Sequence, residues 1–156
     1  LTKEFNTKLV KNVFDYQNHP YAIVYFYNVY GPREIEQGAY ETVVGKFLRL
    51  QRNKQNLTVV RPGNQERNFT HVFDTINALL LIMENGEGDG FGIGNDTSIT
   101  IHDLAKLISD KIELVPERHS NRTSAKVYSE KTKMLGWNAT IQLKDYIQNH
   151  VQKYIQ

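Results

Sequence analysis

Hydrophobic and polar positions follow two different patterns along this chain, and each pattern predicts a different element. Residues 2–17 place apolar side chains such as Phe5 and Leu9 at the three- and four-residue spacing of an amphipathic helix. Residues 21–27, preceded by Pro20, form a continuous apolar and aromatic run, which predicts a strand buried on both faces. A helix followed by such a strand is the second half of a βαβ unit. We therefore expect a preceding strand that lies outside this sequence.

The rest of the chain predicts short elements of both kinds. Helical spacing marks residues 40–52, 73–84, 101–112, 130–135 and 143–155. Extended segments are predicted at residues 57–60, 68–72, 90–93 and 111–115. Thr100 followed by Asp103 is similar to a capping box, which predicts a helix start. The helix at 73–84 carries Ile76, Leu79, Leu80 and Met83 on one side. This mixture of elements predicts an α/β fold.

Composition narrows the class of protein. The chain has 156 residues, enough for a domain with a hydrophobic core, and a net charge of +2, too small to indicate a nucleic-acid or membrane partner. It contains no cysteine, which excludes disulfides and thiolate metal sites and fits a reducing compartment, so we expect a cytoplasmic protein. The chain begins at Leu1, already inside a helical pattern, and we expect it to be part of a longer protein.

Common catalytic and cofactor motifs are absent. The glycines between Gly86 and Gly94 do not fit the Gly-x-Gly-x-x-Gly spacing of a dinucleotide loop, and Glu87 and Asp89 would repel a pyrophosphate. The five histidines never stand at metal-ligand spacing, and no serine lies in a Gly-x-Ser-x-Gly elbow.

Two arginines and the end of one strand are the candidates for chemistry. Tyr27 and Asn28 end the strand at 21–27, where open α/β sheets bind ligands, although an ordinary turn explains the same pattern. Arg67 follows a turn and Arg118 follows a predicted strand, and the guanidinium fork suits a diphosphate. Taken singly, each arginine is better explained as a solvated surface residue.

Four segments in order carry a family resemblance. They are residues 25–33 (YFYNVYGPR), 67–74 (RNFTHVFD), 91–94 (FGIG) and 131–137 (KTKMLGW). Together they resemble the C-terminal half of the extended short-chain dehydrogenase/reductase family, in particular nucleotide-sugar epimerases and dehydratases of the UDP-glucose 4-epimerase type. The resemblance implies that residues 1–32 are the last helix and strand of a Rossmann-type NAD-binding domain. Residues 33–156 would be mostly the smaller mixed α/β substrate-binding domain, with the strand 90–93 either there or back in the Rossmann sheet.

The resemblance also implies roles for single residues. Lys3 matches the lysine of the family's Tyr-x-x-x-Lys pair, which binds the nicotinamide ribose and lowers the pKa of the tyrosine, here upstream of Leu1. Since that tyrosine is not in the chain, an exposed lysine on a surface helix remains the alternative. Tyr27 matches a residue that contacts the nicotinamide, and Asn28 one that binds the substrate diphosphate.

Three further positions match the family's substrate site. Arg67 and Arg118 resemble two arginines that grip the diphosphate, and Val60 lies in the strand that lines the base pocket, in place of a common aromatic residue. The pattern departs at Tyr25, where the family has arginine, and at Asn68 and Phe73, where it has aspartate.

The resemblance implies the C-terminal, substrate-binding portion of an NAD-dependent nucleotide-sugar epimerase or 4,6-dehydratase. We expect this chain alone to be inactive and not to bind NAD, and to form a homo-oligomer or to pair with its N-terminal half. The alternative is a non-catalytic homologue or fragment that binds a nucleotide sugar or a partner chain.

Overall fold

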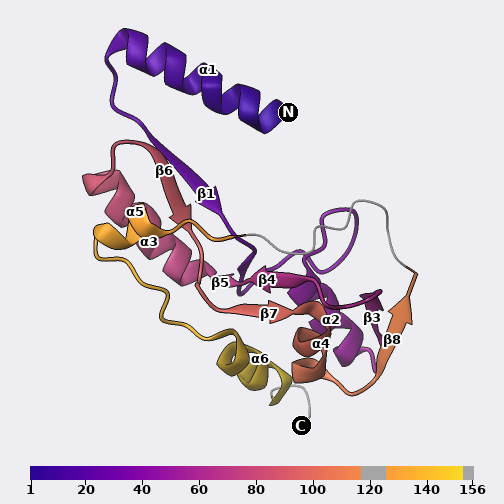
Figure 1. Ribbon diagram of the computed structural model, residues 1–156. Coiled ribbons are helices and arrows are strands. Elements are labelled where there is room, and N and C mark those ends of the chain that lie inside the picture. Colours follow the sequence, from indigo (N-terminus) through magenta and orange to yellow (C-terminus); the bar gives the residue numbers. More distant parts are fainter. Residues whose placement is uncertain (117–125, 153–156) are drawn as a thin grey trace.

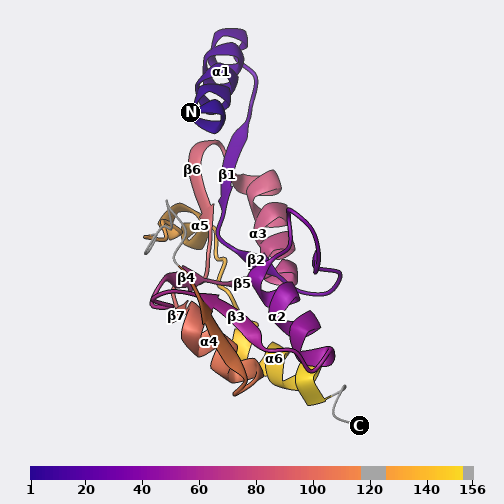
Figure 2. The same cartoon turned by 90° about the vertical axis from the view of Figure 1, so that its right-hand side faces the viewer.

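A computed structural model describes residues 1–116 and 126–152 (Figures 1 and 2). The chain starts with helix α1 (Thr2–Gln17) and continues into strand β1 (Ala22–Phe26). Asn18 ends α1 with φ 52°, a left-handed conformation that asparagine tolerates at a helix C-terminus. In both views α1 stands apart from the body and runs back along β1, so its first turn lies toward the carboxyl end of the strand.

The elements that follow are short and alternate between helix and strand. They are β2 (Val29–Tyr30), α2 (Val43–Arg52), β3 (Leu57–Val60), β4 (Glu66–Asn68), β5 (Thr70–His71), α3 (Val72–Asn85), β6 (Gly88–Ile93), β7 (Ser98–Thr100), α4 (Ile101–Ile108), β8 (Ile112–Val115), α5 (Glu130–Met134) and α6 (Leu143–Gln152). The predicted α/β fold class is confirmed.

In the part of the chain that the structure describes, the strands form four separate pairs. β1 lies parallel to β6, β2 to β5 and β3 to β8, while β4 and β7 are antiparallel. The strand predicted at residues 90–93 is part of β6, and its Ile93 stands beside Phe26 of β1. How the chain divides into domains stays a prediction.

Two hydrophobic clusters hold the body together. The larger one joins α2, β3, α4 and α6 through buried side chains such as Phe47, Leu57, Leu104 and Ile147. The smaller one packs α3 against β6 and includes Ala78, Ile82, Phe91, Ile93 and Trp137. The larger cluster forms the framework for a pocket described below.

The predicted helix start at Thr100 is confirmed in atomic detail. Thr100 Oγ1 accepts a hydrogen bond from the Asp103 backbone N–H at 3.0 Å and donates one to the Asp103 carboxylate at 2.7 Å. Thr42 caps α2 in the same way, with its hydroxyl oxygen accepting from Gly45 N at 3.1 Å.

The expectation that the strand at 21–27 is buried on both faces is wrong. No residue of β1 is buried, and the Phe26 side chain is 53% exposed. β6 is the one strand that pairs with β1 within the described residues, and α1 contributes no buried residue to cover it. The apolar run therefore predicted the strand, but not whether other elements bury its side chains.

The apolar side of α3 noted in the sequence is largely exposed. Ile76, Leu80 and Met83 are exposed, whereas Ala78 and Ile82 are buried against Phe91 and Trp137. α3 carries apolar residues on more than one side, so contacts with β6 and the segment after α5 select which side is buried. Other differences are local: Tyr40 lies outside α2, Val72 begins α3, and Ile112 belongs to β8.

Candidate functional site

A pocket of about 430 Å³ opens where α2, β3 and β4 meet the end of β1. Its lining includes Asn28, Val60 and Arg67, three of the residues predicted from the sequence to bind substrate. These positions are far apart in the chain and reach the pocket from three different elements. Their roles in binding remain proposals.

Asn28 follows β1 directly and has φ 36°, in the left-handed region where asparagine is one of the few tolerated residues. Its side-chain amide donates to the Asn68 carbonyl at 3.1 Å, and its own carbonyl accepts from Thr70 N at 3.2 Å. These bonds tie the turn after β1 to β4 and β5. Asn28 is thereby held at one wall of the pocket.

Val60 reaches the pocket because side chains alternate along a strand. In β3, Leu57 and Val59 are buried in the larger hydrophobic cluster, whereas Thr58 and Val60 point the other way and line the pocket. Arg67 lies in the middle of β4, in register with Ile99 of β7, and its Nη1 donates to the Glu66 carbonyl at 2.7 Å. Arg67 is half-buried at the pocket wall.

Among the described residues, the charged side chains of the lining are Glu34, Glu41, Lys46 and Arg67, two acidic and two basic. Glu41 is paired: Lys46 Nζ lies 3.3 Å from one carboxylate oxygen, and Arg49 Nη2 lies 3.5 Å from the other. Glu34 instead accepts hydrogen bonds from Gly31 N in the loop, and from Gly45 N and the Thr42 hydroxyl at the start of α2. The pocket therefore presents both polar and charged groups beside an apolar wall.

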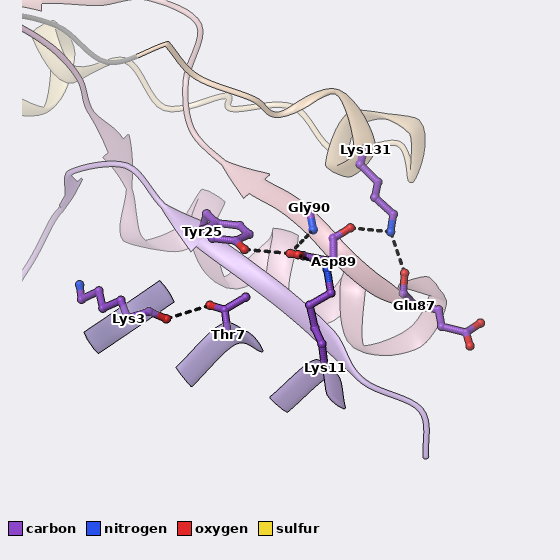
Figure 3. A network of polar contacts seen from close by, with 8 residues as sticks. All are labelled: Lys3, Thr7, Lys11, Tyr25, Glu87, Asp89, Gly90 and Lys131. Carbon is purple, nitrogen blue, oxygen red and sulfur yellow. Dashed lines mark hydrogen bonds and ion pairs between the residues drawn. The ribbon is translucent and has the colours of Figure 1, made fainter. Parts of the chain in front are cut away.

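The two predicted cofactor-contacting residues, Lys3 and Tyr27, do not line this pocket. Lys3 is exposed on the first turn of α1, where its carbonyl accepts from the Thr7 hydroxyl at 3.0 Å (Figure 3). Tyr27 is half-buried, its ring packs on Gly94, and its hydroxyl oxygen accepts from Tyr128 N at 3.3 Å. Arg118 lies outside the described residues.

A polar network joins α1 to the sheet (Figure 3). The Asp89 carboxylate accepts from Tyr25 Oη at 2.9 Å, Lys11 Nζ at 3.1 Å and Gly90 N at 2.7 Å. Burial tends to raise the pKa of Asp89, but the hydrogen bonds from Tyr25 and Lys11 outweigh it and lower the pKa below its ordinary value. Asp89, which stood out in the sequence only as a reason against a dinucleotide loop, therefore remains ionised and anchors α1.

Sequence analysis missed Glu34 and Lys46 as pocket residues. One signal was present: Gly45 stands inside a helix. Glycine lowers the stability of a helix, so its presence there indicates that another group approaches the backbone closely. A Cβ atom on Gly45 would lie 2.9 Å from Thr42 Oγ1 and 3.2 Å from Glu34 Cβ. The glycine thus marks the place where the loop before α2 crosses the helix.

Residues 1–94 match the family model described as the NAD dependent epimerase/dehydratase family. The chain belongs to this family. Among curated relatives, this epimerase/dehydratase chain is 29% identical over 144 residues to UDP-glucuronic acid decarboxylase 3 of Arabidopsis thaliana, with 85% of this chain and 41% of the relative covered. It is 26% identical over 159 residues to dTDP-D-glucose 4,6-dehydratase of Homo sapiens, which covers 93% of this chain and 44% of the relative.

Solved structures confirm the fold of the epimerase/dehydratase chain. A crystal structure of UDP-glucose 4-epimerase from Thermotoga maritima with UDP-glucose superposes with a TM-score of 0.89 at 24% identity, covering 99% of this chain and 53% of that one. The chain thus spans about half the length of the proteins it matches. No helix in the described ranges is long and apolar enough to cross a membrane. The same ranges hold no cluster of side chains suited to a metal ion.

Proposed function

We propose that this chain is the substrate-binding portion of an NAD-dependent nucleotide-sugar epimerase or dehydratase, and that the pocket holds the nucleoside diphosphate. One observation carries the proposal: Asn28, Val60 and Arg67, matched to the family's substrate site from the sequence, line one pocket. The named relatives act on UDP- or dTDP-sugars, which supports this class of ligand.

In this proposal Arg67 and Asn28 bind the diphosphate. A guanidinium offers paired N–H donors that match phosphate oxygens, and Asn28 lines the same pocket. Lys46 adds a second positive charge to the wall. Arg118 is proposed as a further diphosphate ligand on the family resemblance alone.

The base would lie against the apolar wall. Val60 provides part of that wall, and Phe69 and Ile101 line the pocket with it. A valine in place of a stacking aromatic residue gives contact area without a π-face, so we expect weaker binding of the base than an aromatic residue would give. Binding energy from base and diphosphate, both remote from the reacting carbon, would position the sugar.

Lys3 and Tyr27 are proposed to face NAD in the full enzyme. α1 and β1 run in opposite directions, so the turn that carries Lys3 and the strand end that carries Tyr27 lie toward the same side of the fold (Figure 1). Bound NAD supplies the hydride acceptor. Lys3 would hold the nicotinamide ribose, and Tyr27 would bound the nicotinamide. These residues suit the nicotinamide end of the cofactor. This sequence contains no glycine loop for the pyrophosphate.

Calorimetric titration of UDP into the chain tests the proposal. Arg67→Ala should weaken UDP binding by about 2–4 kcal/mol, since truncating one partner of a buried charge contact typically costs 2–5 kcal/mol. Arg67→Lys should recover only part of that loss, because a point charge cannot make the bidentate contact. Arg61→Ala, an exposed arginine that does not line the pocket, is the matched control. Wild-type UDP affinity in Arg67→Ala would contradict the assignment.

A second candidate function, binding a partner chain, is favoured by the apolar side of α1. Phe5 and Leu9 are 65% and 51% exposed, and Val10 and Val13 are exposed beside them. An uncovered apolar helix side of this kind is typical of an interface. Here the epimerase/dehydratase chain would act as a non-catalytic homologue or as part of an assembly.

A further inference from the structure

The loop of residues 31–41 carries Glu34 onto the first turn of α2, inside the candidate pocket. Glu34 Oε1 accepts from Gly31 N at 2.9 Å. Glu34 Oε2 accepts from Gly45 N at 3.1 Å and from the Thr42 hydroxyl. The side chain is half-buried and is part of the pocket lining. A carboxylate of the protein itself therefore occupies the start of a helix that faces the ligand.

Gly45 makes this close approach possible. A side chain at this position would meet Thr42 Oγ1, Glu34 Cβ and the Ile35 carbonyl, the last at 3.2 Å. The backbone also holds the loop there, since Thr42 N donates to the Ile35 carbonyl at 2.9 Å. The loop is thus seated on α2 by local backbone contacts and by the Glu34 carboxylate.

Glu34 differs from its acidic neighbours in how its negative charge is paired. Glu41 is paired with Lys46 and Arg49, and Glu36 with Arg52. Within residues 1–116 and 126–152, no cation lies at ion-pair distance from Glu34, and its carboxylate is held by N–H and O–H donors. The negative charge is held by these donors, of which Gly45 N and the Thr42 hydroxyl lie at the start of α2 and Gly31 N lies in the loop.

The donors that hold Glu34 are those an anionic ligand would use. Backbone N–H groups at a helix start, together with the helix dipole, favour a phosphate oxygen as well as a carboxylate. The pocket also contains Arg67, which attracts the same ligand, and Lys46, which is paired with Glu41. Two anions cannot share one set of donors without strong repulsion, so a phosphate placed here must displace the carboxylate.

We propose that Glu34 is a specificity-determining residue whose carboxylate occupies the phosphate position at the start of α2 and must be displaced by a nucleoside diphosphate. The inference rests on the proposed function of the pocket. Glu34 lowers the affinity for highly charged ligands relative to uncharged ones. Displacement also releases the loop 31–41 from α2, which couples ligand charge to the state of this loop.

The test compares UDP and uridine, titrated calorimetrically into the wild-type chain and its variants. Glu34→Ala should bind UDP roughly threefold to tenfold more tightly, the scale of one favourable charge at a helix start. Glu34→Gln, which removes the charge and keeps the shape, should show a smaller gain in the same direction. Uridine affinity should stay unchanged in both. Glu36→Gln is the matched control, because it loosens the same loop at Arg52 without removing a charge from the pocket lining.

Amide hydrogen exchange gives a second measurement. Addition of UDP should speed exchange at Gly31 N in the wild-type chain, because the Glu34 acceptor leaves. In Glu34→Ala the exchange should already be fast and should not respond to UDP. Circular dichroism checks that each variant keeps the wild-type fold.

The outcomes separate this inference from the proposed function. Tighter UDP binding by both Glu34 variants, with Glu36→Gln at the wild-type value, supports it. Wild-type UDP affinity in a folded Glu34→Ala, or an equal gain for uridine, overturns the role of Glu34 and leaves the pocket assignment intact. Failure of every variant and of the wild-type chain to bind UDP or uridine overturns the proposed function itself.

Discussion

Lys11 of α1 and Asp89 of β6 are 78 residues apart in sequence, and their side chains form an ion pair with Nζ and Oδ2 3.1 Å apart. Tyr25 of β1 donates to the other oxygen of the same carboxylate. The three residues belong to the helix and the two strands at the N-terminal end of the fold. Asp89 thus holds α1, with Lys3 at its start, against the β1–β6 pair.

Replacing Asp89 by Asn should loosen α1 without unfolding the body. The loss of charge weakens the contacts with Lys11 and Tyr25, while the hydrophobic clusters contain no residue of α1. We expect amide exchange in α1 to rise a few-fold, the scale of an exposed ion pair, and exchange in α4 to stay the same. Asp110→Asn, an exposed aspartate far from this network in sequence, is the control. Equal exchange in α1 of both variants would show that the pair does not anchor the helix.

Asp74 should be one of the most sensitive positions for stability. It is buried, and its carboxylate accepts from Thr140 Oγ1 at 2.8 Å, Thr140 N at 3.0 Å and Ile141 N at 2.9 Å. Asp74→Ala leaves these donors without an acceptor and should lower the free energy of unfolding by about 2–4 kcal/mol in urea titration. Thr140→Ser keeps the hydroxyl and serves as the control. A loss below about 0.5 kcal/mol for Asp74→Ala, the range of ordinary surface changes, would contradict the role.

His71 should make stability depend on pH. Burial lowers the pKa of His71 below its ordinary value of 6.5, although the Asp74 carboxylate opposes the shift. Its Nδ1 accepts from Phe73 N at 3.2 Å, which requires a neutral ring. The unfolded chain therefore binds a proton that the folded chain resists, so stability is full above the unfolded pKa and falls as pH drops below it.

Urea titrations between about pH 7.5 and pH 5 measure this effect, since the unfolded histidine titrates in that window. His71→Gln should reduce the loss of stability at the acidic end, and His19→Gln, at an exposed histidine, should leave the wild-type slope unchanged. Identical slopes for wild-type chain and His71→Gln would refute the contribution of His71.

The exposed side of α1 should drive association. Phe5 and Leu9 together offer a large apolar area, and covering a leucine side chain stabilises a contact by about 1.5–3 kcal/mol. Leu9→Lys should therefore raise the concentration needed for self-association about tenfold or more in sedimentation experiments. Lys8→Gln, on the same helix, is the control. A wild-type chain that stays monomeric at high concentration would count against the interface.

The isolated chain should not bind NAD measurably. It has no Gly-x-Gly-x-x-Gly loop, and its two candidate contacts, Lys3 and Tyr27, serve only the nicotinamide end. Calorimetry with NAD checks this, and circular dichroism shows that the preparation is folded. Micromolar NAD binding would contradict the proposal that this chain contacts only the nicotinamide end of the cofactor.

Local features could be predicted from the sequence because they depend on neighbours within a turn or two. The apolar spacing of residues 2–17 predicted α1 (Thr2–Gln17), and Thr100 with Asp103 predicted the start of α4. The strand at residues 57–60 is β3 (Leu57–Val60). In each case the signal and the structure it indicates lie in the same short segment.

The candidate site was only partly predictable. Asn28, Val60 and Arg67 were singled out one by one through the family resemblance, and no local pattern showed that they share a pocket. Asn28 reaches β4 through its hydrogen bond to the Asn68 carbonyl, a contact that joins distant parts of the chain. Glu34 was missed because its position depends on a loop that crosses α2 at Gly45.

The sequence by itself therefore determined where helices and strands begin and which residue types the family site needs. Only the tertiary structure decided that β1 is uncovered, that α3 buries Ala78 and Ile82, and that Glu34 occupies the start of α2. Periodicity and capping are set by bonds between near neighbours. Burial and pocket geometry are set by contacts across the fold, where several apolar sides compete and the best-packed one is buried.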